Sequence, residues 1–240
     1  MVPLSLWNTL YLENHDHPRI ISRYGDDRRF HRESGTMLAA CYLFQQGTPF
    51  IYQGQEIGMT NIRLTSIDQY ADLSSKNNYH RFHTKDPVEK RLERIYHSSR
   101  DSARTPMQWD RSANAGFTTG KPWFHVNPNY RRINVKTEEA DEYSILNFYR
   151  KCLAYRKSSD VALWGSYREY FRSDNYIYMY TRSYKGKMLL VVCSFADHDV
   201  SWKLPRLLAG KKGRLVICNY PCSSYTRASY GWSVRSECAG

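Results

Sequence analysis

Residues 7–19 constrain the fold more than any other part of this chain. They open with apolar and β-prone residues, among them Trp7, Leu10 and Leu12, which predict a short buried strand. Because burying charged groups costs free energy, we expect the polar cluster that follows to open onto a cleft at the carboxyl end of the strand, where α/β barrels hold their reacting groups. Pro18 ends the strand, and the cluster consists of Glu13, Asn14, His15, Asp16, His17 and Arg19.

A helix and a second strand follow. Residues 33–46 predict a helix that ends at Gly47, and residues 48–52 predict a short buried strand. A strand, a helix and a strand in this order form a βαβ unit, whose two strands run parallel. We therefore expect Asp16 and the turn at residues 53–56 to lie side by side at one sheet edge. The apolar face of the helix comprises Met37, Leu38, Cys41, Tyr42 and Phe44.

Residues 60–135 are polar and irregular, with a helix predicted at 87–98. Within this region, residues 104–123 contain two prolines, two glycines and two tryptophans, which predict a compact, ordered loop. Loops of this length are usually functional or disordered, and the aromatic content favours function. Residues 142–157 then predict another helix with one apolar side.

The composition changes after Ser158. Short β-prone runs broken by turn residues predict an all-β module. We therefore divide the chain into residues 1–158, an α/β part, and residues 159–240, a β-domain. The runs are 167–171, 176–184, 188–195, 200–204 and 215–220.

The bulk composition fits a globular protein, because 41% of the 240 residues are hydrophobic. The net charge of +12 would suit a nucleic-acid partner, but lysine and arginine are spread along the chain and no nucleic-acid motif accompanies them. No apolar run approaches the roughly 20 residues that span a membrane, and residues 1–12 lack the features of a signal peptide. We therefore expect a cytoplasmic protein with neither a nucleic-acid nor a membrane partner.

The six cysteines form no Cys-x-x-Cys pair, which argues against a zinc site. Cys41, Cys152 and Cys193 fall in apolar segments and are expected to be reduced core residues. A disulfide between Cys218 and Cys222 stays open. We predict no bound metal and no cofactor.

Four segments carry a resemblance to a known family. Residues 12–19, Leu-Glu-Asn-His-Asp-His-Pro-Arg, resemble the Asn-His-Asp signature of the alpha-amylase superfamily, glycoside hydrolase family 13. Residues 47–61 resemble the eighth barrel strand of that family, and residues 103–110 and 115–120 resemble the loop after it. The segments occur in the family's order over most of the chain. They are most similar to the oligo-1,6-glucosidase branch, which includes trehalose-6-phosphate hydrolases and dextran glucosidases.

The resemblance implies cleavage of α-glucosidic bonds with retention, by a nucleophilic carboxylate, an acid/base carboxylate and a third, transition-state-stabilising aspartate. Asp16 matches the third carboxylate, and His15 matches a histidine that binds the sugar. Arg19 is expected to keep Asp16 ionised and, with His15 and Arg104, to complete the substrate-binding set. His17 departs from the glutamine or leucine often found there, which puts the leaving-group side of the pocket in doubt.

The resemblance also implies that much of the enzyme is missing. A complete (β/α)₈ barrel takes about 250 residues, whereas only two barrel strands are predicted here. No segment resembles those that carry the nucleophile, the acid/base or the N-terminal metal loop, and Glu56 is expected to be structural rather than catalytic. We therefore predict the C-terminal part of a (β/α)₈ barrel followed by a small antiparallel β-sandwich, inactive alone. Its expected partners are an oligosaccharide such as isomaltose and a missing N-terminal half. The exposed edge of the strand at residues 7–12 is expected to lead to aggregation, oligomerisation or docking with that half.

Two alternatives stay open. The chain could belong to a trehalose-6-phosphate hydrolase or a dextran glucosidase, since the residues near the nucleophile set linkage preference. It could also be a non-catalytic interaction module of the same superfamily, although His15, Asp16 and Arg19 together argue against that.

Overall fold

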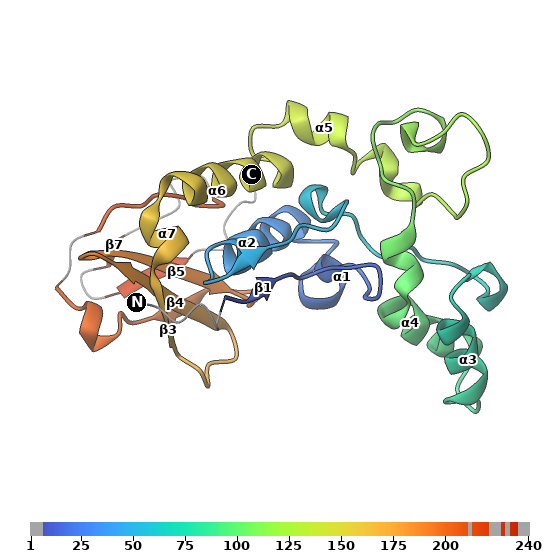
Figure 1. The fold of residues 1–240 in the computed structure, drawn as a ribbon. Helices are drawn as coiled ribbons and strands as arrows, with labels where there is room; N and C mark the ends of the chain where they lie inside the picture. Colours follow the sequence, from blue (N-terminus) through green and yellow to red (C-terminus); the bar gives the residue numbers. More distant parts are fainter. Residues whose placement is uncertain (1–6, 211–212, 221–226, 229–230, 235–240) are drawn as a thin grey trace. The chain divides into compact units, whose positions relative to one another are not determined.

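The computed structural model describes residues 7–210, 213–220, 227–228 and 231–234 (Figure 1). The chain divides into two compact units. The first, here called the site unit, comprises Thr9–Gly35 and Pro49–Tyr149. The second, the sheet unit, comprises Met1–Asn8, Thr36–Thr48 and Arg150–Gly240.

The predicted βαβ unit is present. Strand β1 (Thr9–Leu10) pairs with strand β2 (Thr48–Pro49), and helix α2 (His31–Leu43) lies between them in the chain. The strands run parallel, because the two backbone hydrogen bonds that join them advance by two residues along both strands. These bonds run from the Thr48 amide to the Asn8 carbonyl (2.8 Å) and from the Phe50 amide to the Leu10 carbonyl (2.7 Å).

These two strands are shorter and more exposed than predicted. Tyr11 is 52% exposed, Phe50 55% and Ile51 37%, so the prediction of buried strands at 7–12 and 48–52 was wrong. Parallel strands are buried when further strands and helices cover both of their faces. In the described part of the chain, this sheet consists of β1 and β2 alone.

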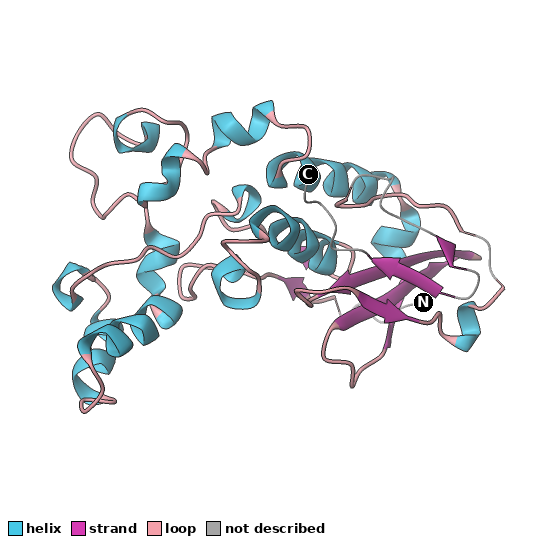
Figure 2. Cartoon of the chain, turned by 180° about the vertical axis from the view of Figure 1, so that it is seen from behind, coloured by secondary structure: helices cyan, strands magenta, loops and turns pink. Residues whose placement is uncertain are grey.

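The helices with an apolar side were predicted correctly to within a few residues. They are α2, α4 (Val88–Ser98) and α6 (Ile145–Ser158). Helix α3 (Leu73–Arg81) was missed, because its polar sequence shows no apolar period. It lies beside α4 (Figures 1 and 2). The other short helices are α1 (Ile20–Tyr24), α5 (Val135–Ala140) and α7 (Asp160–Trp164). No described helix is long and apolar enough to cross a lipid bilayer.

The sheet unit contains two antiparallel sheets of three strands each (Figure 2). The first, in the order β3-β4-β5, buries Met179 and Tyr180 of its central strand. The second has the order β6-β8-β7. The strands are β3 (Ser166–Tyr170), β4 (Ile177–Tyr184), β5 (Lys187–Ser194), β6 (Val200–Trp202), β7 (Arg227–Ala228) and β8 (Gly231–Val234).

Four of the five predicted β-prone runs form strands, and the fifth does not. Residues 215–220 are described without a strand, and Leu215 and Val216 are exposed. A β-prone run becomes a strand only where a partner pairs with it, and this run has none among the described residues. Cys41, Cys152 and Cys193 are buried free thiols, as predicted. Cys222 lies outside the described residues.

The long loop of the site unit is ordered around two apolar clusters. Residues 104–123 form the predicted compact loop, in which the amides of Trp109 and Asp110 donate to the Ala115 carbonyl (2.9 and 3.2 Å). One cluster comprises Ile57, Met59 and Met107. The other comprises Ile62, Leu64, Ile67, Tyr70, Tyr79, Ile95 and Phe124.

Glu138 of α5 is expected to make the stability of the site unit depend on pH. Burial raises the pKa of its carboxyl from 4.5 to about 7, against the effect of hydrogen bonds from Leu146 and Ile145 at the start of α6. The protonated form is therefore favoured in the folded state, and its stabilising contribution is complete below pH 4.5 and lost as the pH rises through 7. One pKa unit corresponds to about 1.4 kcal/mol, so the free energy of unfolding falls by at most roughly 3 kcal/mol. Because the Glu138 carboxyl keeps partial access to solvent, we expect about half of that decrease.

Glu138→Gln is expected to remove this pH dependence, because the amide stays neutral while its oxygen still accepts from Leu146 (3.2 Å in the wild type). Urea unfolding between pH 5 and 8 measures the free energy of unfolding of both proteins. We expect the variant to become more stable than the wild type as the pH rises. The exposed Glu89→Gln serves as the control. A constant difference between Glu138→Gln and the wild type over this range would contradict the prediction.

Candidate active site

The polar cluster after β1 forms a turn that directs two side chains to solvent. The Asn14 side chain accepts a hydrogen bond from the Asp16 amide (2.8 Å), which is the geometry of an Asx turn. The side chains of His15 and Asp16 are 68% and 48% exposed. The asparagine of the Asn-His-Asp motif therefore shapes the backbone here, and the other two residues face outward.

Asp16 lies between two arginines and a histidine. Its Oδ1 accepts from Arg100 Nη1 (3.0 Å) and Arg104 Nη2 (3.1 Å), and its Oδ2 lies 3.3 Å from His15 Nε2. Both arginines belong to one short 3₁₀ helix, Arg100–Arg104. Arg104 also donates from Nε to the His15 carbonyl (2.9 Å). The fold thus brings together three of the four residues that the sequence predicts for the site.

The cations keep Asp16 ionised. Desolvation by itself raises the pKa of the Asp16 carboxyl, but the hydrogen bond from Arg100 and the charges of His15, Arg100 and Arg104 together outweigh it. The pKa consequently lies below its usual range. Because both arginines bind Oδ1, the other carboxylate oxygen remains available toward His15 and solvent.

The structure corrects the expectation for Arg19. This side chain is fully buried, so its guanidinium offers no surface to a sugar. It donates to Glu13 Oε2 (3.0 Å) and to the Gln53 carbonyl (2.7 Å). Pro18 and the start of α1 at Ile20 turn Arg19 inward, and the role of keeping Asp16 ionised falls to Arg100 and Arg104.

Arg19 instead holds three segments of the site unit together. Besides the turn after β2, it reaches the carbonyls of Ser102 (3.2 Å) and Ala103 (3.4 Å) in the 3₁₀ helix that carries Arg100 and Arg104. The bond to Gln53 confirms that the segments following the two parallel strands lie side by side. Arg19 therefore stabilises the 3₁₀ helix that carries the two arginines bound to Asp16.

Two further carboxyl groups near Arg19, those of Glu13 and Glu56, lie in the interior of the site unit. Burial raises the pKa of Glu13 despite its ion pair with Arg19, and its Oε1 accepts from the Ile20 amide (2.8 Å). Glu56, in the 3₁₀ turn Gln55–Ile57, has its pKa raised by burial, and its Oε2 is buried without a hydrogen-bond partner.

Sequence reasoning missed Arg100 and its second partner, Asp72. Arg100 donates from Nε (3.2 Å) and Nη2 (2.5 Å) to Asp72 Oδ1, so the arginine bridges two carboxylates. The one local signal was the spacing of Arg100 and Arg104, four residues apart. Nothing in the sequence placed Asp72 beside them.

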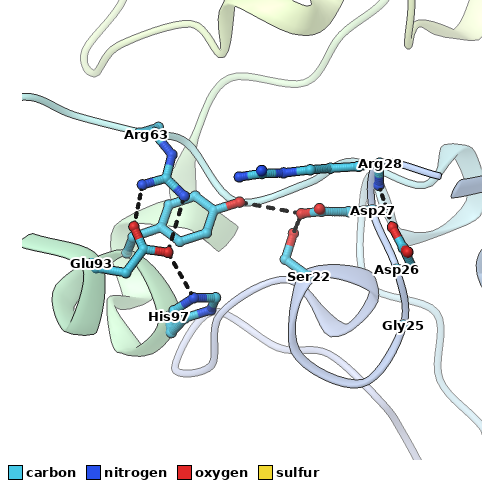
Figure 3. Close-up of a pocket in the computed structure, with 9 residues that line it drawn as sticks. Ser22, Gly25, Asp26, Asp27, Arg28, Arg63, Glu93 and His97 are labelled. Carbon is cyan, nitrogen blue, oxygen red and sulfur yellow. Dashed lines mark hydrogen bonds and ion pairs between the residues drawn. The ribbon is translucent and has the colours of Figure 1, made fainter. Parts of the chain in front are cut away.

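A polar cavity of about 430 Å³ lies elsewhere in the site unit (Figure 3). Asp27 accepts from Ser22 (2.5 Å) and Tyr96 (3.2 Å), and Glu93 pairs with Arg63 and His97. These groups satisfy one another, as in a structural ion-pair network. The lining residues are Ser22, Gly25, Asp26, Asp27, Arg28, Arg63, Glu93, Tyr96 and His97.

Comparison with known proteins identifies the family. The family model of the alpha-amylase catalytic domain matches residues 1–165. The chain therefore belongs to the alpha-amylase family, and its similarity to oligo-1,6-glucosidases at 41–46% identity confirms the predicted branch.

Among the relatives, an oligo-1,6-glucosidase of Parageobacillus thermoglucosidasius is 46% identical over 217 residues, covering 89% of this chain and 38% of the relative. A trehalose-6-phosphate hydrolase of Bacillus subtilis is 42% identical over 204 residues, covering 85% and 36%. The solved trehalose-6-phosphate hydrolase of Bacillus licheniformis has a TM-score of 0.89 at 37% identity, covering 95% of this chain and 41% of that one. The chain thus spans about two fifths of the length of these relatives.

Proposed function

We propose that this chain is the C-terminal portion of a retaining α-glucosidase that hydrolyses α-1,6 bonds of short oligosaccharides such as isomaltose. Asp16 stabilises the transition state, and His15 and Arg104 bind the sugar. The observation that carries the proposal is a half-exposed carboxylate, held ionised by two arginines after a parallel strand, in a chain of the oligo-1,6-glucosidase branch.

Retaining glycosidases pass through a transition state in which positive charge develops on the sugar ring. A fixed negative charge beside that ring lowers its free energy without reorganisation during the reaction. Arg100 and Arg104 fix Asp16 through Oδ1, and Oδ2 is the oxygen left to meet the sugar. His15 and Arg104, both in contact with Asp16, are placed to bind neighbouring hydroxyls.

One carboxylate cannot complete this reaction, which needs a nucleophile and an acid/base. Of the nearby acids, Glu13 is buried and Glu56 is largely so. The proposal therefore assigns both missing roles to an N-terminal half of the enzyme. Two observations support this assignment: the chain spans about two fifths of the length of its relatives, and Tyr11, Phe50 and Ile51, which directly follow the two parallel strands, are exposed.

We propose the following architecture for the chain. Residues 1–158 form the last part of a (β/α)₈ barrel, and residues 159–240 form a β-sandwich domain. The oligosaccharide and the N-terminal half are the two partners. Trehalose-6-phosphate is the second candidate substrate, because hydrolases named for it are among the relatives at 42% and 37% identity.

The direct test is glucose release from isomaltose and from trehalose-6-phosphate by the purified 240-residue chain, beside Asp16→Asn. No release from either protein is expected, because the carboxylate pair is absent. Release that disappears in Asp16→Asn would mean that this chain supplies its own pair. Release that Asp16→Asn leaves intact would refute the assigned role of Asp16.

A further inference from the structure

Asp72 is a buried acid that serves two structures at once. It precedes α3 and caps the helix: its carboxylate accepts from the amides of Ser74 (3.4 Å) and Ser75 (3.1 Å) and from the Ser75 hydroxyl (2.8 Å). The same carboxylate receives two nitrogens of Arg100. Its side chain is 3% exposed, against 37% for Arg100.

The position of Asp72 is fixed independently of Arg100. The Asp101 carboxylate accepts from the backbone amides of Ala71 (2.8 Å) and Asp72 (2.9 Å). The Ser75 and Ser99 hydroxyl oxygens lie 2.9 Å apart; because Ser75 donates its one proton to Asp72, Ser99 is the donor in this pair, and Ser99 caps the 3₁₀ helix that carries Arg100. The start of α3 and the start of this 3₁₀ helix are therefore joined by hydrogen bonds in both directions.

We propose that Asp72 is a positioning residue for Asp16 and acts through Arg100. An exposed arginine loses rotamer entropy when it is held in one geometry. Here two of the three guanidinium nitrogens are anchored on a buried carboxylate, which directs the third, Nη1, to Asp16 Oδ1 (3.0 Å). The orientation of Asp16 is thereby set before any sugar arrives. The inference rests on the role proposed for Asp16.

Asp72→Asn distinguishes two roles for Asp72, because a positioning role and a purely electrostatic role change the pKa of Asp16 in opposite directions. Removing a negative charge near Asp16 would by itself lower the pKa of Asp16. Releasing Arg100 from its anchor weakens the bond to Asp16 and raises that pKa. The groups that face Asp16 directly are His15, Arg100 and Arg104, and the substitution leaves all three in place.

The experiment is a carboxyl-carbon NMR titration of Asp16 in the 240-residue chain. Asparagine is as good a helix cap as aspartate, so Asp72→Asn should keep α3 folded. We expect the pKa of Asp16 to rise by at least about half a unit in Asp72→Asn and by more in Arg100→Met. Asp110→Asn, at a partly exposed acid that contacts Ser112, should leave the pKa of Asp16 unchanged.

An unchanged or lowered pKa of Asp16 in Asp72→Asn would overturn the proposal. If this variant loses its cooperative thermal transition, Asp72→Ser supplies a second capping residue without the charge, and the same shift is expected. The titration needs no substrate. A failure of the proposed glucosidase function would therefore appear in hydrolysis assays and leave this result unaffected.

Discussion

Replacing Arg182 with methionine is expected to lower the free energy of unfolding of the sheet unit by about 3–5 kcal/mol. Arg182 lies fully buried in the central strand β4, and in the described structure its partners are backbone carbonyls. It donates five hydrogen bonds: two to Gly165 (2.9 and 2.7 Å) and one each to Phe44 (2.7 Å), Ala162 (2.9 Å) and Leu163 (3.1 Å).

These carbonyls lie at the carboxyl ends of α2 and α7, where unpaired carbonyl groups concentrate negative partial charge. Burial, assisted by the nearby charge of Arg156, lowers the pKa of Arg182 to about 10, and the side chain stays ionised at neutral pH. Methionine fills much of the same volume and leaves the carbonyls buried without donors. Each unsatisfied group costs roughly 1–3 kcal/mol before relaxation.

Urea denaturation of the chain, followed by circular dichroism, measures the effect. Arg182→Lys should fall between wild type and Arg182→Met, because one ammonium keeps the charge but cannot reach every carbonyl. The matched control is Arg168→Met on the neighbouring strand β3, where the side chain is exposed, and its expected effect is within about 0.5 kcal/mol. A loss below about 1 kcal/mol in Arg182→Met would show that water replaces the guanidinium.

The candidate site was predictable where its residues are neighbours in the sequence. His15 and Asp16 share one motif, and Arg104 belongs to a second segment with its own resemblance. Asp72 and Arg100 were missed because they are 28 residues apart, and only the packing of α3 against the loop joins them. Arg19 was misplaced for the opposite reason. It lies three residues from Asp16 in sequence, yet the chain turns between them and buries it.

The secondary structure shows the same contrast between features that a local pattern encodes and features that depend on distant segments. Apolar periodicity located α2 and α6, since each has a face to bury, and residues 87–98, where α4 forms, were also predicted to be helical. Helix α3 depends on its Asp72 cap, and periodicity cannot detect a cap. The strand–helix–strand order correctly gave parallel β1 and β2, but their burial depends on neighbouring strands, which a local pattern does not encode.

Asp16→Asn is expected to lower kcat/KM for isomaltose at least about 100-fold in an enzyme that also contains the nucleophile and the acid/base which we propose an N-terminal half supplies. Such an enzyme is a chimera in which this chain replaces the matched 217 residues of the Parageobacillus oligo-1,6-glucosidase, which is 46% identical there. The amide keeps the shape of the side chain and can accept from Arg100, but it has no charge to oppose the positive sugar ring. The loss should therefore appear mainly in kcat.

Asp110→Asn in the same chimera is the matched control, because Asp110 is partly exposed and bonds locally to Ser112. It should keep the activity of the parent chimera. Comparable activity in both variants would mean that Asp16 does not stabilise the transition state. A chimera that melts as cooperatively as the relative and yet hydrolyses neither isomaltose nor trehalose-6-phosphate would favour the interaction-module alternative.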